Sequence, residues 1–323
     1  MADQNHSNGF PTEITLVTGA SGFVGSHLVT EMARRKLPAL GITRSQMPGL
    51  VPVPSYGPEM DWREWLQGTS TVVHLAARVH VMRETAENPL ALFREVNVNA
   101  TLNLAKQAAD TGVRRFVFVS SIKVNGERTE PGKPFTAGDP PDPQDPYGIS
   151  KAEAEAALMA LGQRTGMEIT IVRPPLVYGQ GVRGNFRSLM KWAASGVPSI
   201  FPLVKNKRSF IYVGNLCDLL ITVLDHPAAK NRIFLASDGR DLSTHELLTQ
   251  MARAAGRHPI NLPVPASILH GLGVLTGRQD VIARLTECLQ VDVTSTCQSL
   301  GWHPQVPVDD AIKALFRPRE PSR

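Results

Sequence analysis

Short apolar runs alternate with longer amphipathic segments along the first half of the chain. Runs rich in Val and Ile, without polar alternation, predict buried strands of a parallel sheet at Ile14–Val17, Ala39–Ile42, Thr71–Leu75, Phe116–Val119 and Glu168–Val172. Apolar residues at helical spacing predict helices between them, at Phe23–Arg35, Leu90–Ala109 and Ala152–Leu161. Strands that alternate with helices through right-handed crossovers form a doubly wound α/β sheet.

The pattern changes after Arg173, where prolines and glycines become frequent and the apolar segments become shorter. Ser243 and Glu246 have the spacing of a capping box, which predicts a helix running from there to about Ala255. Asp309–Phe316 has the pattern of a final amphipathic helix. We therefore expect a smaller, less regular α/β domain in the second half.

Composition and charge exclude several classes of protein. The 323 residues carry a formal charge of +5 without one long basic run, which fits an anionic ligand and argues against nucleic acid as a partner. Cys217, Cys288 and Cys297 have no short pair spacing, so we expect a reducing cytoplasm and no disulfide framework or metal site. No apolar run approaches the roughly 20 residues that span a bilayer, and Ile268–Leu275 is too short.

A glycine-rich turn follows the first predicted strand and opens the first predicted helix. Glycines at 19, 22 and 25 allow a tight turn, close approach of the backbone to a pyrophosphate, and packing of the helix on the sheet. A tight turn without a ligand is the alternative, but its place between strand and helix favours a Rossmann-type dinucleotide site. We assign cofactor contacts to Gly19, Ser21, Gly22, Phe23, Val24 and Gly25.

The end of the second predicted strand bears on the choice of cofactor. An NAD site usually carries an acidic residue there, which binds the ribose 2′-hydroxyl group. Here the strand ends in Thr43 and Arg44, and Arg44 is suited to a 2′-phosphate. We therefore expect NADP(H) to be favoured, with NAD(H) possible, unless Arg44 is a solvated surface residue.

Tyr147 and Lys151 are one helical turn apart on one face of a predicted helix. A free phenol has a pKa near 10, which is high for proton transfer at neutral pH, and a neighbouring lysine favours the phenolate. Ser121 follows the strand Phe116–Val119, where its hydroxyl group can bond a reacting carbonyl or alcohol. The Tyr/Lys pair alone is also common on exposed helix faces; its place downstream of the glycine turn and Ser121 favours catalysis.

Together these motifs occur in the order typical of extended short-chain dehydrogenases/reductases. The motifs are the glycine turn, His74–Ala77, Asn97–Thr101, Ser120–Ser121 and Tyr147–Lys151. The chain resembles the branch of this family that holds nucleotide-sugar epimerases, dehydratases and 4-keto reductases. The resemblance implies catalysis by Ser121, Tyr147 and Lys151, a UDP-linked sugar as substrate, and a homodimer.

The resemblance also implies further binding residues and a division of the chain. Additional cofactor contacts are expected from Leu75, Ala76, Ala77, Asn97, Lys151 and Pro174. Substrate contacts are expected from Lys123, Asn185, Arg208 and Arg284. The expected division is a flexible N-terminus at 1–12, a dinucleotide-binding domain at 13–174 to which about 208–236 return, a mainly nucleotide-sugar-binding domain at 175–317, and a flexible tail at 318–323.

Three positions depart from the patterns of the branch and narrow the expected reaction. Ile122 and Lys123 stand where the 4,6-dehydratases carry an Asp–Glu pair, so dehydration is not expected. Leu176 stands where many 4-epimerases carry an asparagine. The segments 121–126 and 173–179 resemble reductases of UDP-4-keto-6-deoxy-N-acetylhexosamines from bacterial O-antigen pathways.

The sequence therefore favours NAD(P)H-dependent reduction of a 4-keto sugar to the quinovosamine or fucosamine form. A UDP-sugar 4-epimerase that holds NAD tightly is the alternative, because it uses the same three catalytic residues. A non-catalytic Rossmann protein that senses nucleotides is a more distant alternative, which the retained Tyr/Lys pair disfavours.

Overall fold

The computed structural model describes residues 13–79 and 88–317, and the flexible ends expected at 1–12 and 318–323 lie outside the described residues. Two compact units interleave along the chain. Unit 1 consists of Met1–Val119, Ser150–Ile171 and Val223–Arg232, and unit 2 consists of Ser120–Ile149, Val172–Thr222 and Ile233–Arg323. The assignment of separate cofactor-binding and sugar-binding domains stays a prediction.

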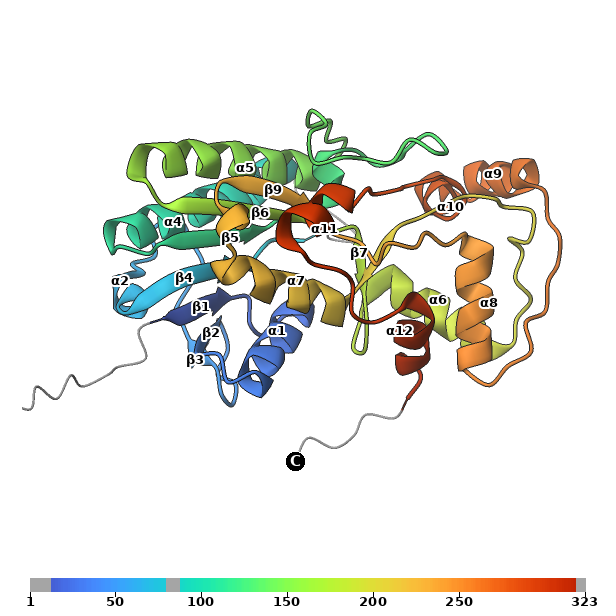
Figure 1. The fold of residues 1–323 in the computed structure, drawn as a ribbon. Coiled ribbons are helices and arrows are strands. Elements are labelled where there is room, and N and C mark those ends of the chain that lie inside the picture. Colours follow the sequence, from blue (N-terminus) through green and yellow to red (C-terminus); the bar gives the residue numbers. More distant parts are fainter. Residues whose placement is uncertain (1–12, 80–87, 318–323) are drawn as a thin grey trace, which may run out of the picture. The chain divides into compact units, whose positions relative to one another are not determined.

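The larger sheet has seven strands in the order β3-β2-β1-β4-β5-β6-β9 (Figure 1). The strands are β1 Ile14–Thr18, β2 Ala39–Thr43, β3 Val51–Pro52, β4 Thr69–His74, β5 Arg115–Val119, β6 Glu168–Arg173 and β9 Arg232–Leu235. The pairs of β1 with β2 and β4, of β2 with β3, and of β4 with β5 are parallel. This strand order confirms the predicted doubly wound α/β fold.

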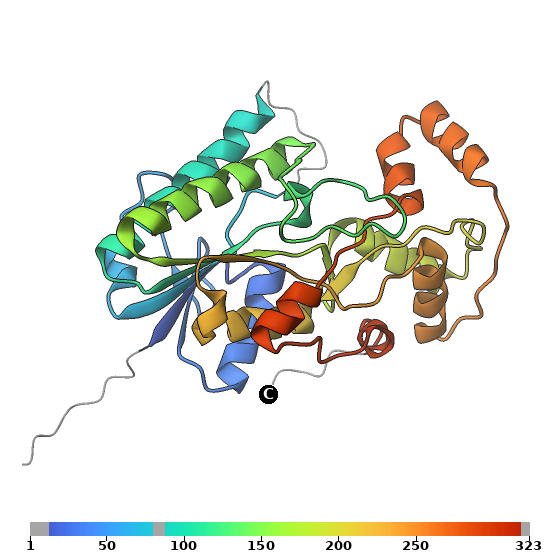
Figure 2. The same cartoon turned by 45° about the horizontal axis from the view of Figure 1, so that its top comes forward.

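Helices cover both faces of this sheet, with α4 and α5 on one face and α1 on the other (Figures 1 and 2). The helices up to Thr165 are α1 Phe23–Arg34, α2 Arg63–Leu66, α3 Pro89–Arg94, the π-helix η1 Glu95–Ala100, α4 Thr101–Asp110, the 3₁₀ turn Ile122–Val124 and α5 Pro146–Thr165. Helix α1 buries Gly25, Leu28 and Met32, a stripe at helical spacing.

Two predicted helices differ from the structure in an informative way. The single helix expected at Leu90–Ala109 is interrupted by the π-helix, a feature often found at functional sites. The helix expected at Ala152–Leu161 begins earlier, at Pro146. Proline is pre-organised for the first helical position, and the Oδ1 atom of Asp145 accepts a hydrogen bond from the N–H of Gly148 at 2.7 Å.

The chain beyond Arg173 forms a small parallel sheet and a set of short helices. The sheet pairs β7 Leu176–Tyr178 with β8 Phe210–Tyr212. The helices are α6 Gly184–Ser195, α7 Val213–Asp225, the 3₁₀ turn Pro227–Ala229, α8 Thr244–Ala254, α9 Ala266–Leu275, α10 Gln279–Thr286, α11 Thr294–Leu300 and α12 Val308–Ala314. Both hydrogen bonds of the predicted capping box between Ser243 and Glu246 are present, which confirms the start of α8.

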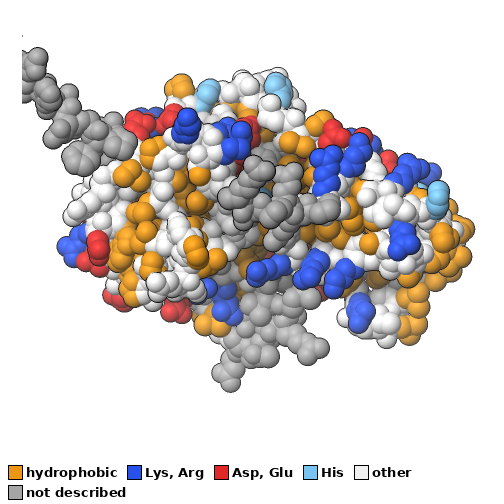
Figure 3. All heavy atoms as spheres, turned by 90° about the horizontal axis from the view of Figure 1, so that it is seen from below, with side chains coloured by type: hydrophobic (Ala, Val, Ile, Leu, Met, Phe, Trp, Pro, Cys, Tyr) orange, Lys and Arg blue, Asp and Glu red, His pale blue; other side chains and the backbone are white. Residues whose placement is uncertain are grey.

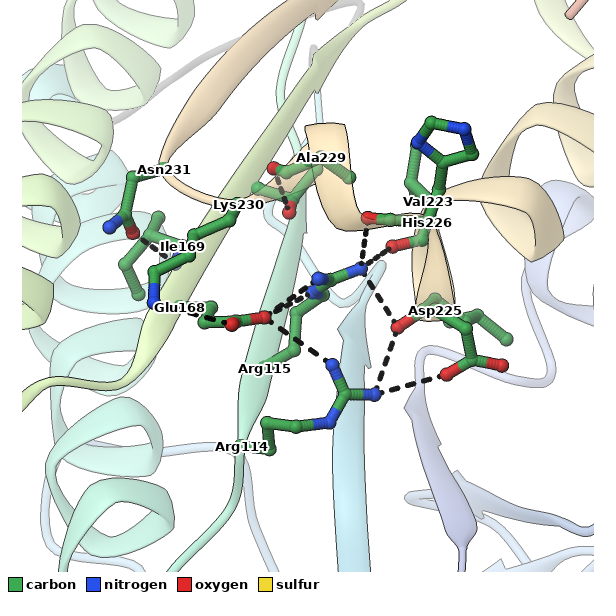
Figure 4. Close-up of polar contacts among 12 residues, drawn as sticks. Arg114, Arg115, Glu168, Ile169, Val223, Asp225, His226, Ala229, Lys230 and Asn231 are labelled. Carbon is green, nitrogen blue, oxygen red and sulfur yellow. Dashed lines mark hydrogen bonds and ion pairs between the residues drawn. The ribbon is translucent and has the colours of Figure 1, made fainter. Parts of the chain in front are cut away.

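A buried arginine is the main polar feature in the core of unit 1 (Figure 4). Arg115 is only 1% exposed, and its Nε and Nη2 atoms donate to one carboxylate oxygen of Glu168 at 2.9 and 2.7 Å. Its Nη1 atom donates to the carbonyl groups of Val223, Leu224 and His226. Burial alone raises the pKa of Glu168, but the hydrogen bond and charge of Arg115 outweigh it and lower that pKa.

We expect Glu168→Gln to destabilise the protein by about 3–5 kcal/mol, since it leaves the buried Arg115 cation without its anion. Because the folded-state pKa of Glu168 is lowered, this stabilisation is present at neutral pH and is lost as the pH falls through that pKa. Chemical denaturation at pH 7 measures the effect. Glu153→Gln is the matched control, because it removes an exposed ion pair with Arg94 and should change stability little. Equal stability of the two variants would contradict this role of Arg115.

Candidate active site

The glycine-rich turn in unit 1 has no room for side chains at two of its glycines. Gly19 adopts a φ of +68°, and a Cβ atom there would lie 2.7 Å from the nitrogen of Ala76. A Cβ atom at Gly25 would overlap the carbonyl oxygen of Gly19 and lie 2.8 Å from the Cα atom of Ala20. Gly22 precedes α1 in an extended conformation and, within the described residues, no side-chain hydrogen bond caps the helix there. This backbone cradle fits the pyrophosphate of a dinucleotide.

We expect Gly25→Ala to weaken cofactor retention and lower Tm. The added methyl group forces the turn open at an estimated cost of about 1–3 kcal/mol. The cofactor content of the purified variant and its melting temperature measure the change. Gly57→Ala is the control, because the nearest atom to a Cβ there is 3.8 Å away. Unchanged retention in Gly25→Ala would contradict the assignment of the turn.

Side chains from two neighbouring segments hold this turn in place. The Oγ1 atom of Thr43, at the end of β2, donates to the Oγ atom of Ser21 at 3.1 Å. The hydroxyl group of Tyr56 accepts from the N–H of Gly19 at 3.3 Å and donates to the carbonyl group of Ile42 at 3.0 Å. Burial raises the pKa of Tyr56 to about 12, so it stays a neutral donor. Tyr56 was not predicted from the sequence, because nothing in the local pattern links residue 56 to the turn.

The end of β4 is joined to the same turn through a buried histidine. The ring and two hydroxyl groups form a chain in which Nδ1 of His74 lies 2.8 Å from Oγ1 of Thr18 and Nε2 lies 3.0 Å from Oγ1 of Thr101. Oγ1 of Thr18 also accepts from the N–H of Ala76 at 3.3 Å. Burial, assisted by the positive charge of Lys151, lowers the pKa of His74 to about 3. A neutral His74 therefore shapes the segment that contains Leu75, Ala76 and Ala77, whose cofactor contacts stay predictions.

Asn97, in the π-helix, is 1% exposed and uses its whole amide group. Its Oδ1 atom accepts from the N–H of Arg78 at 2.8 Å, and its Nδ2 atom donates to the Arg78 carbonyl group and to the Ser150 hydroxyl group, both at 3.0 Å. Asn97 thus fixes the segment after β4 relative to α5, and we assign it a positioning role. Its direct contact with a cofactor stays a prediction.

Lys151 is buried on the second turn of α5, the helix that also carries Tyr147. Its Nζ atom donates to the carbonyl group of Val119 at 2.9 Å and lies 4.3 Å from the ring centroid of Phe118. Burial lowers the pKa of Lys151 to about 7, although Glu155 opposes the shift. The ammonium group is therefore poised between its charged and neutral forms near physiological pH.

Tyr147 and Ser121 meet in unit 2, where the phenol is hydrogen-bonded to the serine side chain. The Oγ atom of Ser121 also accepts from the N–H of Lys123 at 3.3 Å, which orients it at the start of a 3₁₀ turn. Burial and the charge of Asp145 raise the pKa of Tyr147 more than the Ser121 bond lowers it. Burial therefore acts against the lowering of the Tyr147 pKa that is expected from a neighbouring lysine.

Lys123, predicted to contact substrate, is paired with two carboxylates. Its Nζ atom lies 2.6 Å from Oε1 of Glu127 and 2.6 Å from Oδ2 of Asp145. Asp145 thus caps the start of α5 through one carboxylate oxygen and forms an ion pair with Lys123 through the other. A substrate contact by Lys123 stays a prediction. Asp145 was not predicted from the sequence, although an Asp–Pro pair before a helix is a signal for a helix start.

The other predicted site residues of unit 2 are Pro174, Arg208, Arg284 and Asn185, and the structure does not bring all of them together. The carbonyl group of Pro174 accepts from the N–H of Ile122 at 2.9 Å. Burial lowers the pKa of Arg208; Glu127, Glu287 and Cys288 oppose the shift, and the positive charge of Arg284 adds to it. Diphosphate contacts by Arg208 and Arg284 stay predictions. Asn185 is exposed near the start of α6, and no contact described in the structure joins it to either arginine.

Two further observations concern ligands. The hydroxyl group of Ser120 is buried and has no hydrogen-bond partner among the described residues, so it is available to a bound ligand. Within 13–79 and 88–317, no three His, Cys, Asp or Glu side chains come together closely enough to hold a metal ion.

The chain is similar to known proteins over most of its length. The family described as "NAD dependent epimerase/dehydratase family" matches residues 15–236. A UDP-glucose 4-epimerase of Vibrio cholerae is 44% identical over 92% of this chain and 93% of that protein. An N-acetyl-alpha-D-glucosaminyl-diphospho-ditrans,octacis-undecaprenol 4-epimerase of Escherichia coli O157:H7 is 29% identical over 83% of this chain and 82% of that protein.

A solved structure is similar over nearly the whole chain. The UDP-glucose 4-epimerase of Thermus thermophilus, in complex with NAD, matches with a TM-score of 0.71 and 25% identity over 94% of this chain and 97% of that one.

Proposed function

Because the chain belongs to the NAD-dependent epimerase/dehydratase family, we propose that it is a UDP-sugar 4-epimerase with NAD as its resident cofactor. The observation that carries the chemistry is the hydrogen bond between Tyr147 and Ser121 at the start of α5, with Lys151 one turn further along that helix. This arrangement serves proton transfer at an alcohol or ketone oxygen. The 44% identity to a UDP-glucose 4-epimerase over almost the full length supports epimerisation as the outcome.

The three residues divide the work at the C4 oxygen. NAD, when bound, would supply a reversible hydride acceptor for C4 of the sugar. Tyr147 removes the proton of the 4-hydroxyl group and later returns it, while the Ser121 hydroxyl group bonds the oxygen. The raised pKa of Tyr147 favours the neutral phenol that the return step needs. Positive charge on Lys151 favours the phenolate that the first step needs.

Dehydration is not supported by the residues beside Ser121. Ile122 is 3% exposed and apolar, and the ammonium group of Lys123 is engaged by Glu127 and Asp145. Neither position offers the carboxylate that removes a proton and donates one to a leaving hydroxyl group.

A 4-keto reductase, favoured from the sequence alone, becomes the second proposal. One observation supports it: no carboxylate follows β2, and the exposed Arg44 is suited to a 2′-phosphate of NADP(H). The same catalytic residues serve both reactions, so the full-length similarity to a 4-epimerase decides the order of the two proposals.

The guanidinium groups of Arg208 and Arg284 interact electrostatically, and we infer that both bind the diphosphate of the sugar carrier. The substrates named for both relatives hold their sugar on a diphosphate. This diphosphate is joined to uridine in one substrate and to a polyprenol in the other. We infer a UDP-linked substrate, because the relative of higher identity acts on UDP-glucose.

We expect the nucleotide released from the denatured, purified protein to be NAD, close to one per chain, and to be unchanged in Arg44→Ala. Chromatography of the released nucleotide provides the measurement. Arg63→Ala serves as the control, because Arg63 is also exposed and forms an ion pair with Asp61. Release of NADP from the wild type, with loss of this nucleotide in Arg44→Ala alone, would favour the reductase instead.

A further inference from the structure

Exposed apolar side chains concentrate in one short stretch of unit 2. Of the twelve large hydrophobic side chains that are exposed in the described part of the chain, seven lie within residues 260–281. They are Ile260, Leu262, Ile268, Leu272, Val274, Leu275 and Val281. Scattered exposed apolar residues are normal, but a cluster of this kind marks an interaction surface.

Helix α9 has one face packed and one face open. Leu269 and Gly273 are buried, and a Cβ atom at Gly273 would lie 3.0 Å from a side-chain carbon of Ile282 in α10, the helix beside α9 in Figure 1. Ile268, Leu272 and Leu275 follow one another at helical spacing, which forms a single stripe away from that packed face. Their side chains are 52%, 48% and 83% exposed.

Arginine residues lie on both sides of α9 in the sequence. Helix α9 itself contains no acidic or basic residue apart from His270. Arg253 and Arg257 precede it, Arg278 follows it, and Asp280 is the single acidic residue in 253–284. In Figure 3, hydrophobic side chains form the right-hand edge of the face drawn, with Lys and Arg side chains beside them.

An apolar stripe with flanking arginines has the chemistry of a helix that lies in the surface of an anionic bilayer. No helix within the described residues is long and apolar enough to cross a membrane, so any contact through α9 is peripheral. A two-fold contact between two copies would bring the same arginine-flanked surface against itself, which like-charge repulsion disfavours. We propose that α9, with its flanking arginines, docks unit 2 on an anionic lipid surface. This docking does not depend on which sugar the active site converts.

Sedimentation of the full chain with vesicles tests the docking. Wild type is expected to bind vesicles that contain phosphatidylglycerol about tenfold more than vesicles of phosphatidylcholine alone, and to lose most of this binding in high salt. Leu272→Glu/Leu275→Glu is expected to reduce binding to the anionic vesicles about tenfold. Met47→Glu is the matched control, since Met47 is an exposed apolar residue of unit 1.

The outcomes separate docking from its alternatives. Absence of wild-type binding, or equal binding by wild type and the double variant, overturns the proposal. A wild-type dimer that the double variant dissociates, without vesicle binding, assigns the surface to a second copy and also overturns it. If the double variant melts at a lower temperature than wild type, the vesicle experiment is carried out with Arg257→Glu/Arg278→Glu in its place. That charge reversal is expected to abolish binding to anionic vesicles and leave epimerisation unchanged.

Discussion

Tyr147→Phe is expected to lower kcat by about two to four orders of magnitude, the range for loss of a positioned acid or base. The phenol is the group that meets Ser121 at the start of α5, and phenylalanine keeps its volume but cannot move a proton. The substitution removes one hydroxyl group from a partly buried site, so folding and cofactor content should persist. Steady-state turnover of UDP-sugar, with the melting temperature and bound nucleotide of the same sample, provides the measurement.

Tyr212→Phe is the control for this experiment, because Tyr212 lies on β8 and packs against Tyr178. It should retain near-normal turnover. A Tyr147→Phe variant that turned over like Tyr212→Phe would remove Tyr147 from the mechanism, whatever the identity of the sugar.

Lys151→Met is expected to lower kcat by about a hundredfold or more, since it removes the ammonium group carried one turn after Tyr147 on α5. It should also change how stability depends on pH. The pKa of Lys151 is about 7 in the folded chain, against an ordinary value of 10.5. Between these values the unfolded chain binds more protons than the folded chain, so the free energy of unfolding rises with pH.

Lys151→Met lacks this pH-dependent contribution to the free energy of unfolding. Between pH 7 and pH 9, wild type is expected to gain about 1–3 kcal/mol of stability relative to Lys151→Met. Chemical denaturation of both proteins at the two pH values measures the difference. Parallel stability profiles would show that burial does not hold the pKa of Lys151 down.

The strands and the glycine-rich turn were predictable because their signals are local. Buried strands such as Phe116–Val119 are continuous apolar runs, and a glycine at 19 or 25 is required by the path of the backbone itself. The start of α5 was placed too late, because a capping aspartate and a proline carry no apolar periodicity. The π-helix at Glu95–Ala100 was missed because its spacing departs from that of an α-helix by a single bulge.

The sequence names candidate site residues, but it does not reveal their electrostatics. Lys123 is paired with Asp145, a contact between positions far apart in the sequence, and no local pattern shows such a pairing. The pKa of Tyr147 depends on how deeply the phenol is buried, which the spacing to Lys151 does not reveal. Reduction and epimerisation use the same three side chains, so the motifs alone could not rank them.

The most direct test of the central claim is the fate of a deuterium atom at C4 of UDP-glucose or UDP-N-acetylglucosamine, incubated with the purified protein without added cofactor. A 4-epimerase removes the label as hydride and returns it to the same carbon, so the account predicts the 4-epimer with deuterium retained at C4. Failure to form any 4-epimer, together with NADPH oxidation when a UDP-4-keto-6-deoxy sugar is added, would contradict the epimerase assignment and establish the reductase.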